Sequence, residues 1–92
     1  MVDKMLIRKE IHKYLESHRE EIVETLAELV KIPSVRGTAE EGAPFGKDCA
    51  GVLERTEELY RKNGFETELS TEGGYLLSFY GKGEKSLGIF CN

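Results

Sequence analysis

The sequence has few cysteines, no long apolar run and no excess of basic charge, and each shortage argues against a class of protein. Crossing a bilayer takes about 20 predominantly apolar residues, and residues 1–13 carry charges throughout, unlike the apolar core of a secretory signal. The 13 basic residues are outnumbered by 17 acidic ones and form no stripe interleaved with aromatic residues. A polyanion-binding surface needs such a stripe. We therefore expect neither a membrane nor a nucleic-acid partner.

The two cysteines, Cys49 and Cys91, are not spaced as a metal-binding or redox motif. Disulfides are rare in the cytosol, where thiols are kept reduced. We interpret both residues as reduced core thiols of a cytoplasmic protein. A disulfide between them is the alternative interpretation.

Apolar residues recur at helical spacing through the first third of the chain, at Ile7, Ile11, Tyr14, Leu15, Ile22, Leu26, Leu29 and Val30. This pattern predicts a helix over residues 3–17 and a second helix after it. Ser17 and Glu20 have the spacing of a capping box, in which each side chain bonds the backbone of the other. Pro33 ends the second helix, because the residue before a proline avoids the helical region.

A third helix is predicted from about residue 48 to residue 63, where Asn63-Gly64 is a strong stop signal. Its inner face would carry Cys49, Val52, Leu53, Thr56, Leu59 and Tyr60. The connection before it, residues 34–46, contains Pro44 and several glycines. Loops of this length inside compact domains are usually functional or disordered.

The last third of the chain predicts three strands. Polar and apolar residues alternate over residues 65–70, and a turn at residues 72–74 leads into an aromatic strand over residues 75–80. A second turn, residues 81–84, precedes residues 87–91, whose apolar composition is typical of a strand buried on both faces. We therefore expect an α/β fold in which N-terminal helices pack on a small mixed β-sheet.

A strand covered on both faces normally has neighbours on each side within its sheet, and ligands of open α/β folds bind beyond the carboxyl ends of the strands. The sequence stops as the predicted strand over residues 87–91 ends. We therefore expect residues 1–92 to form one partial domain, with the site of a longer protein lying beyond them.

No catalytic constellation is visible among the titratable residues. His12 and His18 are six residues apart, about 120° around a helix, and so share no ligand face. The carboxylates of Glu20, Glu24 and Glu28 follow one helical face, which is typical of a solvated surface. Two further pairs, Glu57 with Arg61 and Glu58 with Lys62, have the i, i+4 spacing of helical ion pairs.

Two loop segments are also weak candidates. Glu40-Glu41 could approach a site from the long connection, but flexible solvated acids are the simpler interpretation. Gly81-Lys82-Gly83 lacks the full phosphate-loop pattern and is expected to be a hairpin turn. No serine lies in a nucleophile elbow, and neither cysteine has an evident histidine partner.

Three stretches occur in an order that points to a family: Ile32-Pro33-Ser34-Val35-Arg36-Gly37, Ala43-Pro44-Phe45-Gly46-Lys47, and Leu87-Gly88-Ile89-Phe90-Cys91. From about His12 to Asn92 the chain resembles the start of the co-catalytic zinc peptidases. These include bacterial dipeptidases, carnosinases, aminoacylases, acetylornithine deacetylase and succinyl-diaminopimelate desuccinylase. The Ala-Pro-Phe-Gly stretch is most similar to the bacterial dipeptidase branch.

The resemblance implies the first part of a phosphorylase/hydrolase-like catalytic domain that hydrolyses dipeptides or N-acyl amino acids. In this family a zinc-held hydroxide attacks the amide carbonyl. The zinc ligands and the general-base Glu belong to later segments, beginning with a His-x-Asp stretch after the last strand. We therefore predict no catalytic, cofactor-binding or metal residue in this chain, no bound zinc, and no hydrolytic activity of the chain alone.

The resemblance leaves two alignments open at Asn92. Asn92 either replaces the family's His ligand, as a poorer zinc donor, or precedes a Gly-His pair beyond it. A function of another class is also open. The chain would then be a standalone structural module that forms a homodimer through an open sheet edge, because unpaired edges template pairing.

Overall fold

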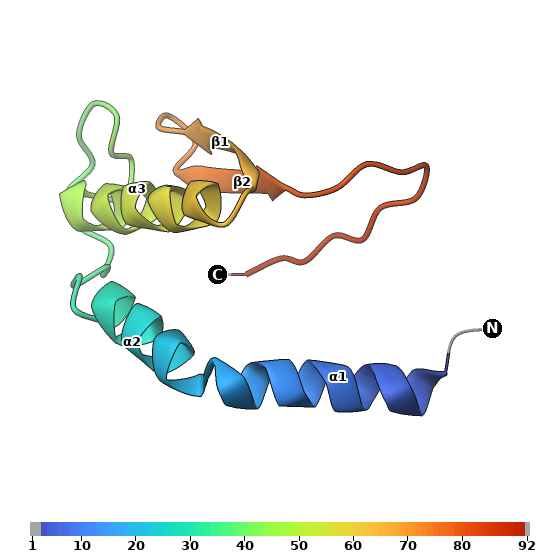
Figure 1. Cartoon of the computed structure of the whole chain (residues 1–92). Helices are drawn as coiled ribbons and strands as arrows, with labels where there is room; N and C mark the ends of the chain where they lie inside the picture. Colours follow the sequence, from blue (N-terminus) through green and yellow to red (C-terminus); the bar gives the residue numbers. More distant parts are fainter. Residues whose placement is uncertain (1–2, 92) are drawn as a thin grey trace.

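The computed structural model describes residues 3–91. Three helices are followed by a hairpin: α1 (Lys4–Ser17), α2 (Arg19–Val30), α3 (Lys47–Lys62), β1 (Glu66–Ser70) and β2 (Tyr75–Phe79). Figure 1 shows α1 and α2 as an arm on one side, α3 against the hairpin on the other, and the C-terminal segment running back between them. At this coarse level, helices packed on a small sheet are compatible with the predicted α/β class.

α1 begins and ends close to the predicted residues. Asp3 caps it, since Oδ1 of Asp3 accepts a hydrogen bond of 2.9 Å from the backbone N–H of Met5. The predicted capping box at Ser17 is wrong, because the Ser17 hydroxyl donates backwards to the carbonyl of Tyr14 (2.8 Å). His18 is instead the residue between α1 and α2, and its ring stacks on Tyr14 at a centroid distance of 4.0 Å.

The third predicted helix is confirmed to within a residue at each end. α3 follows Gly46, whose φ of 101° and ψ of 163° suit glycine alone. At the other end, the Asn63 side chain donates to the carbonyl of Leu59 (2.7 Å), and Gly64 has a φ of 86°. Both glycines therefore mark real changes of backbone direction.

The hairpin is confirmed as well. β1 and β2 pair antiparallel, with Thr67 opposite Ser78 and Leu69 opposite Leu76. These side chains are half-buried, and Arg61 of α3 donates to the hydroxyl of Thr67 (2.8 Å). They form the inner face of the hairpin, against α3. Side chains of the opposite, outer face are Glu66, Glu68, Ser70, Tyr75, Leu77 and Phe79.

The third predicted strand is not formed. Residues 87–91 make no ladder in the described chain, and Leu87, Ile89 and Phe90 are 88%, 82% and 97% exposed. The predicted hairpin turn at residues 81–84 is not formed either, since these residues carry only a bend at Glu84, and the chain reverses in a wide loop away from β2 (Figure 1). The described sheet is therefore a two-stranded antiparallel hairpin and not a mixed sheet. An extended segment without a partner strand leaves its backbone groups to solvent.

Burial is sparse throughout residues 3–91. Ala43, at 6% exposure, is the one hydrophobic residue there that is buried. Large apolar side chains on α1, α2 and β2 remain exposed, among them Ile11, Leu26 and Phe79. No helix of the described range combines the length and the apolar content that a membrane span requires.

Candidate functional site

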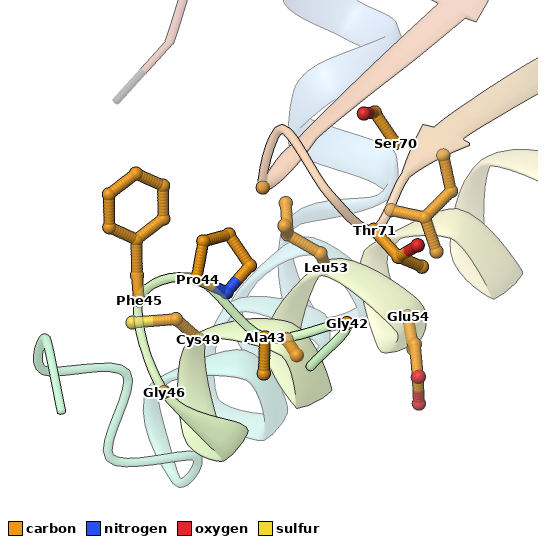
Figure 2. Close-up of a pocket in the computed structure, with 13 residues that line it drawn as sticks. Gly42, Ala43, Pro44, Phe45, Gly46, Cys49, Leu53, Glu54, Ser70 and Thr71 are labelled. Carbon is orange, nitrogen blue, oxygen red and sulfur yellow. The ribbon is translucent and has the colours of Figure 1, made fainter. Parts of the chain in front are cut away.

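A small pocket lies at the N-terminal end of α3 (Figure 2). One wall is the loop of residues 42–46, the opposite wall is the hairpin turn, and α3 contributes Cys49 and Leu53. The loop is held by hydrogen bonds from Gly46 N–H to the Ala43 carbonyl (3.0 Å) and from Gly37 N–H to the Phe45 carbonyl (2.8 Å).

Close packing of loop against hairpin turn gives the pocket its shape. Gly74 has a φ of 69°, and a Cβ placed on it would lie 2.6 Å from Cε2 of Phe45. The Ser70 hydroxyl accepts from the Gly73 N–H (3.0 Å), which fixes the turn. Glu54, Ser70 and Thr71 are the polar side chains among otherwise apolar lining residues. This arrangement can seat a small apolar group, and it holds no nucleophile paired with a base.

A wider, mainly apolar groove separates α3 and the hairpin from the C-terminal segment. It is lined on one side by Cys49, Val52, Leu53, Thr56, Tyr60, Phe65, Leu76 and Ser78, and on the other by Leu87, Ile89 and Cys91. Tyr60, Phe65 and Tyr80 form an aromatic cluster at one end, with centroid distances of 4.9 and 5.1 Å. The groove is thus the unfilled space between α3 and the segment predicted as a third strand.

The two cysteines both line this groove and both are free thiols. Cys49 is half-buried, and its Sγ–H donates to the Ser34 carbonyl at 3.5 Å. Cys91 is exposed, so its interpretation as a core thiol is wrong for this structure. The alternative disulfide is not formed.

The histidines lie where the sequence places them and are not brought into a cluster with other ligands. His12 is exposed on α1, whereas Nδ1 of His18 lies 2.8 Å from the Tyr14 carbonyl and 2.9 Å from the Ser17 hydroxyl. Within residues 3–91, no three His, Cys, Asp or Glu side chains gather in a way that could hold a metal ion. The described residues therefore do not fit a zinc site, and we derive no catalytic step through zinc from them.

Glu28 is exposed, as predicted for its helical face, and it also forms a contact that the sequence did not predict. Its carboxylate accepts a 2.6 Å hydrogen bond from Nε of Arg55, which joins α2 to α3. That bond, with the positive charge of Arg55, holds the pKa of Glu28 below its ordinary value, and the same pairing raises the pKa of Arg55. Glu20 and Glu24 are exposed as well, as predicted.

The two predicted helical ion pairs have different outcomes. Glu57 pairs with Arg61 at 3.3 Å, as the i, i+4 spacing predicts, and also accepts from the Thr67 hydroxyl (3.1 Å). Glu58 pairs with Arg55 at 2.6 Å, so its predicted pairing with Lys62 is wrong. The i, i+3 spacing of Arg55 and Glu58 was a usable signal, whereas nothing in the sequence pointed to Glu28 as a further partner of Arg55.

The loop candidates carry no chemistry in this structure. Glu40 forms an isolated bridge with Ala43 and lies 3.8 Å from Nζ of Lys47, while Glu41 is exposed. Residues 81–83 are exposed chain without a following helix.

Comparison of the chain with family models, with curated proteins and with solved structures finds no match.

Proposed function

We propose that this chain is the N-terminal part of the catalytic domain of a cytoplasmic, zinc-dependent metallopeptidase that hydrolyses dipeptides or N-acyl amino acids. The order of the three motif stretches is the sequence argument for this family. The structural observation that supports it best is the composition of β2, which carries Tyr75, Leu77 and Phe79 on its outer face and Leu76 beside Ser78 on its inner face.

β1 and β2 differ on the outer face of the hairpin. β1 presents Glu66 and Glu68 there, as expected of a strand at the border of a sheet, whereas β2 presents Tyr75, Leu77 and Phe79. Strands with apolar residues on both faces are typical of sheet interiors with a layer on each side. This difference favours a larger layered α/β domain in which β1 is the border strand and β2 has a further neighbour.

Residues 87–91 are the natural neighbour of β2 in that domain. They carry Leu87, Ile89 and Phe90, all strongly exposed here, and they already line the groove beside α3. A strand at this position would cover part of the groove and continue the sheet into the mixed sheet of the proposed fold. Covering the exposed apolar side chains of residues 87–91 and of the groove would stabilise the folded domain by about 25 cal/mol for each Å² of apolar surface removed from water.

The zinc ligands of the family would follow this strand. We accordingly assign no catalytic, cofactor-binding or metal role to any described residue and propose that the 92-residue chain alone is inactive. Asn92, the position on which the two alignments differ, lies outside the described residues. The resemblance implies a small peptide or N-acyl amino acid as the substrate of the full catalytic domain.

The test compares two proteins from one gene. One is the 92-residue chain, and the other extends through the coding sequence that follows residue 92. We expect the longer protein to contain a His-x-Asp stretch within a few residues of Asn92, to bind zinc stoichiometrically by elemental analysis, and to cleave dipeptides. Stoichiometric zinc and dipeptide cleavage by the 92-residue chain would contradict the assignment, as would a continuation without metal ligands.

A second candidate function, a self-associating structural module, is favoured by a separate observation. Within the described chain α1 contacts only α2, yet Leu6, Ile11 and Tyr14 on α1 are more than half exposed. Apolar surface of this kind marks interaction sites in soluble proteins. Light scattering coupled to size-exclusion chromatography tests it, because the candidate requires a dimer and a monomer at all concentrations contradicts it.

A further inference from the structure

We infer that two copies of this chain exchange α1 reciprocally, so that the apolar stripe of each α1 covers the outer face of the hairpin in the other copy. The stripe consists of Ile7, Ile11 and Tyr14, and the outer face is the one defined above. The inference rests on the second candidate function and names the surfaces that would carry it.

The outer face has an apolar row beside an acidic row. Tyr75, Leu77 and Phe79 of β2 are 51%, 43% and 53% exposed. The register places Glu68 directly opposite Leu77 and Glu66 directly opposite Phe79. A helix that covers this face therefore needs an apolar stripe with basic residues along one flank.

α1 has that composition. Its stripe residues are 42%, 55% and 61% exposed and are spaced i, i+4, i+7. Successive residues of a helix are about 100° apart around its axis. Lys4 and Arg8 therefore lie about 60° and 100° around the axis of α1 from Ile7, both on the same flank of the stripe. The helix carries four basic residues and two acidic ones, within a chain whose net charge is −4. Its positive excess therefore complements the acidic row.

The spacings of the two surfaces also agree. Lys4 and Arg8 are four helical residues apart, which is about 6 Å along the helix axis. Glu66 and Glu68 are two strand residues apart, which is about 6.7 Å along the strand. A helix lying along the strands thus brings both basic side chains to both carboxylates. In the same position its apolar stripe lies along β2.

The chain's own α1 is held away from this face. α2 follows α1 and is tied to α3 by the Glu28–Arg55 pair, while α3 packs against the inner face of the hairpin. α1 and the hairpin share no contact in residues 3–91. A two-fold exchange supplies the helix from the second copy and forms two equal interfaces. The two interfaces together would need to bury about 1,200 Å², the lower end of the area found in stable complexes.

The test uses charge reversal on the 92-residue chain, with dimer dissociation measured by analytical ultracentrifugation. We expect Arg8→Glu to weaken the dimer about tenfold. Lys9→Glu makes the same change of charge about 200° from Ile7, away from the stripe, and should leave dissociation within about twofold of the unmodified chain. Combining Arg8→Glu with Glu68→Arg should restore most of the lost dimer affinity, because the two charges again have opposite signs. Circular dichroism checks that each variant keeps its helix content.

Leu77→Glu supplies an independent variant on the hairpin side and should abolish the dimer. A chain that is monomeric at all concentrations overturns both the inference and the self-association candidate, and leaves the peptidase proposal standing. A dimer that is unchanged by Arg8→Glu and Leu77→Glu overturns the inference alone, since the chain then associates through another surface.

Discussion

Replacing Gly46 by alanine tests how the loop before α3 is held. The backbone there has φ 101° and ψ 163°, a conformation that costs a residue with a Cβ about 1–3 kcal/mol. The added Cβ would also lie 2.9 Å from Cα and 3.0 Å from N of Gly37. Both are backbone atoms, so relief requires Gly37 to move.

Moving Gly37 breaks a second interaction. Its N–H donates to the Phe45 carbonyl at 2.8 Å, and a hydrogen bond of this kind contributes about 0.5–1.5 kcal/mol. Strain and lost bond together predict that Gly46→Ala lowers the free energy of unfolding by about 2–4 kcal/mol. The measurement is urea unfolding followed by far-ultraviolet circular dichroism. A loss of 1 kcal/mol corresponds to about 4–8 °C in Tm for a domain of this size.

Two other glycines serve as matched controls. Gly42 has a φ of 75°, and nothing lies within 4 Å of a Cβ placed there, so Gly42→Ala incurs only the left-handed backbone cost of about 1–2 kcal/mol. Gly51, inside α3, also has open space around it, and Gly51→Ala should stabilise by about 0.5–1 kcal/mol. Should Gly46→Ala cost no more than Gly42→Ala, the contact with Gly37 is not restrictive and the reasoning fails. If Gly46→Ala does not fold, the same comparison is made in the Gly51→Ala background.

Two further predictions concern side chains. Arg55 lowers the pKa of Glu28 in the folded chain from the ordinary 4.5, so this pair stabilises fully above that pH and its contribution is lost as the pH falls through the lowered pKa. Glu28→Gln should therefore flatten the acid side of a plot of stability against pH, and an unchanged plot contradicts the pairing. In thiol labelling with a maleimide, exposed Cys91 should react faster than half-buried Cys49. The Cys49→Ser variant reports the labelling rate of Cys91, and the Cys91→Ser variant reports that of Cys49. Equal rates in the two variants would show that Cys49 is not shielded.

The elements that depend on local signals were predictable. Apolar spacing located α1, α2 and α3, and Asn63-Gly64 marked the end of α3, because helix periodicity and backbone freedom act over a few residues. The prediction of a capping box at Ser17 was wrong, although it also rested on a local signal. A serine at a helix end has two backbone partners within reach, and Ser17 bonds the carbonyl behind it at 2.8 Å. A pattern of residue types does not decide between the two.

Contacts between distant residues were not predictable in this way. Glu28 and Arg55 are 27 residues apart, and their pairing depends on how α2 crosses α3. The pocket beside α3 likewise needs Phe45 and Gly74 to meet, which follows from the packing of the loop on the hairpin turn. Each residue alone has an ordinary surface interpretation. Only the assembled helices and hairpin give these residues their partners.

Residues 87–91 show a local sequence signal and the tertiary contacts giving different answers. Their apolar composition predicts burial, and burial of an extended segment requires a strand on at least one side to satisfy its N–H and C=O groups. β2 offers a free edge, but the segment leaves β2 through residues 80–86 and remains exposed. Pairing with β2 would satisfy one edge of the segment and still leave the other edge and one face open, because the described chain has a helix layer on the inner face alone. Pairing with β2 alone would thus leave much of the apolar surface of residues 87–91 in water, and the described residues supply no layer on the outer face that would cover it.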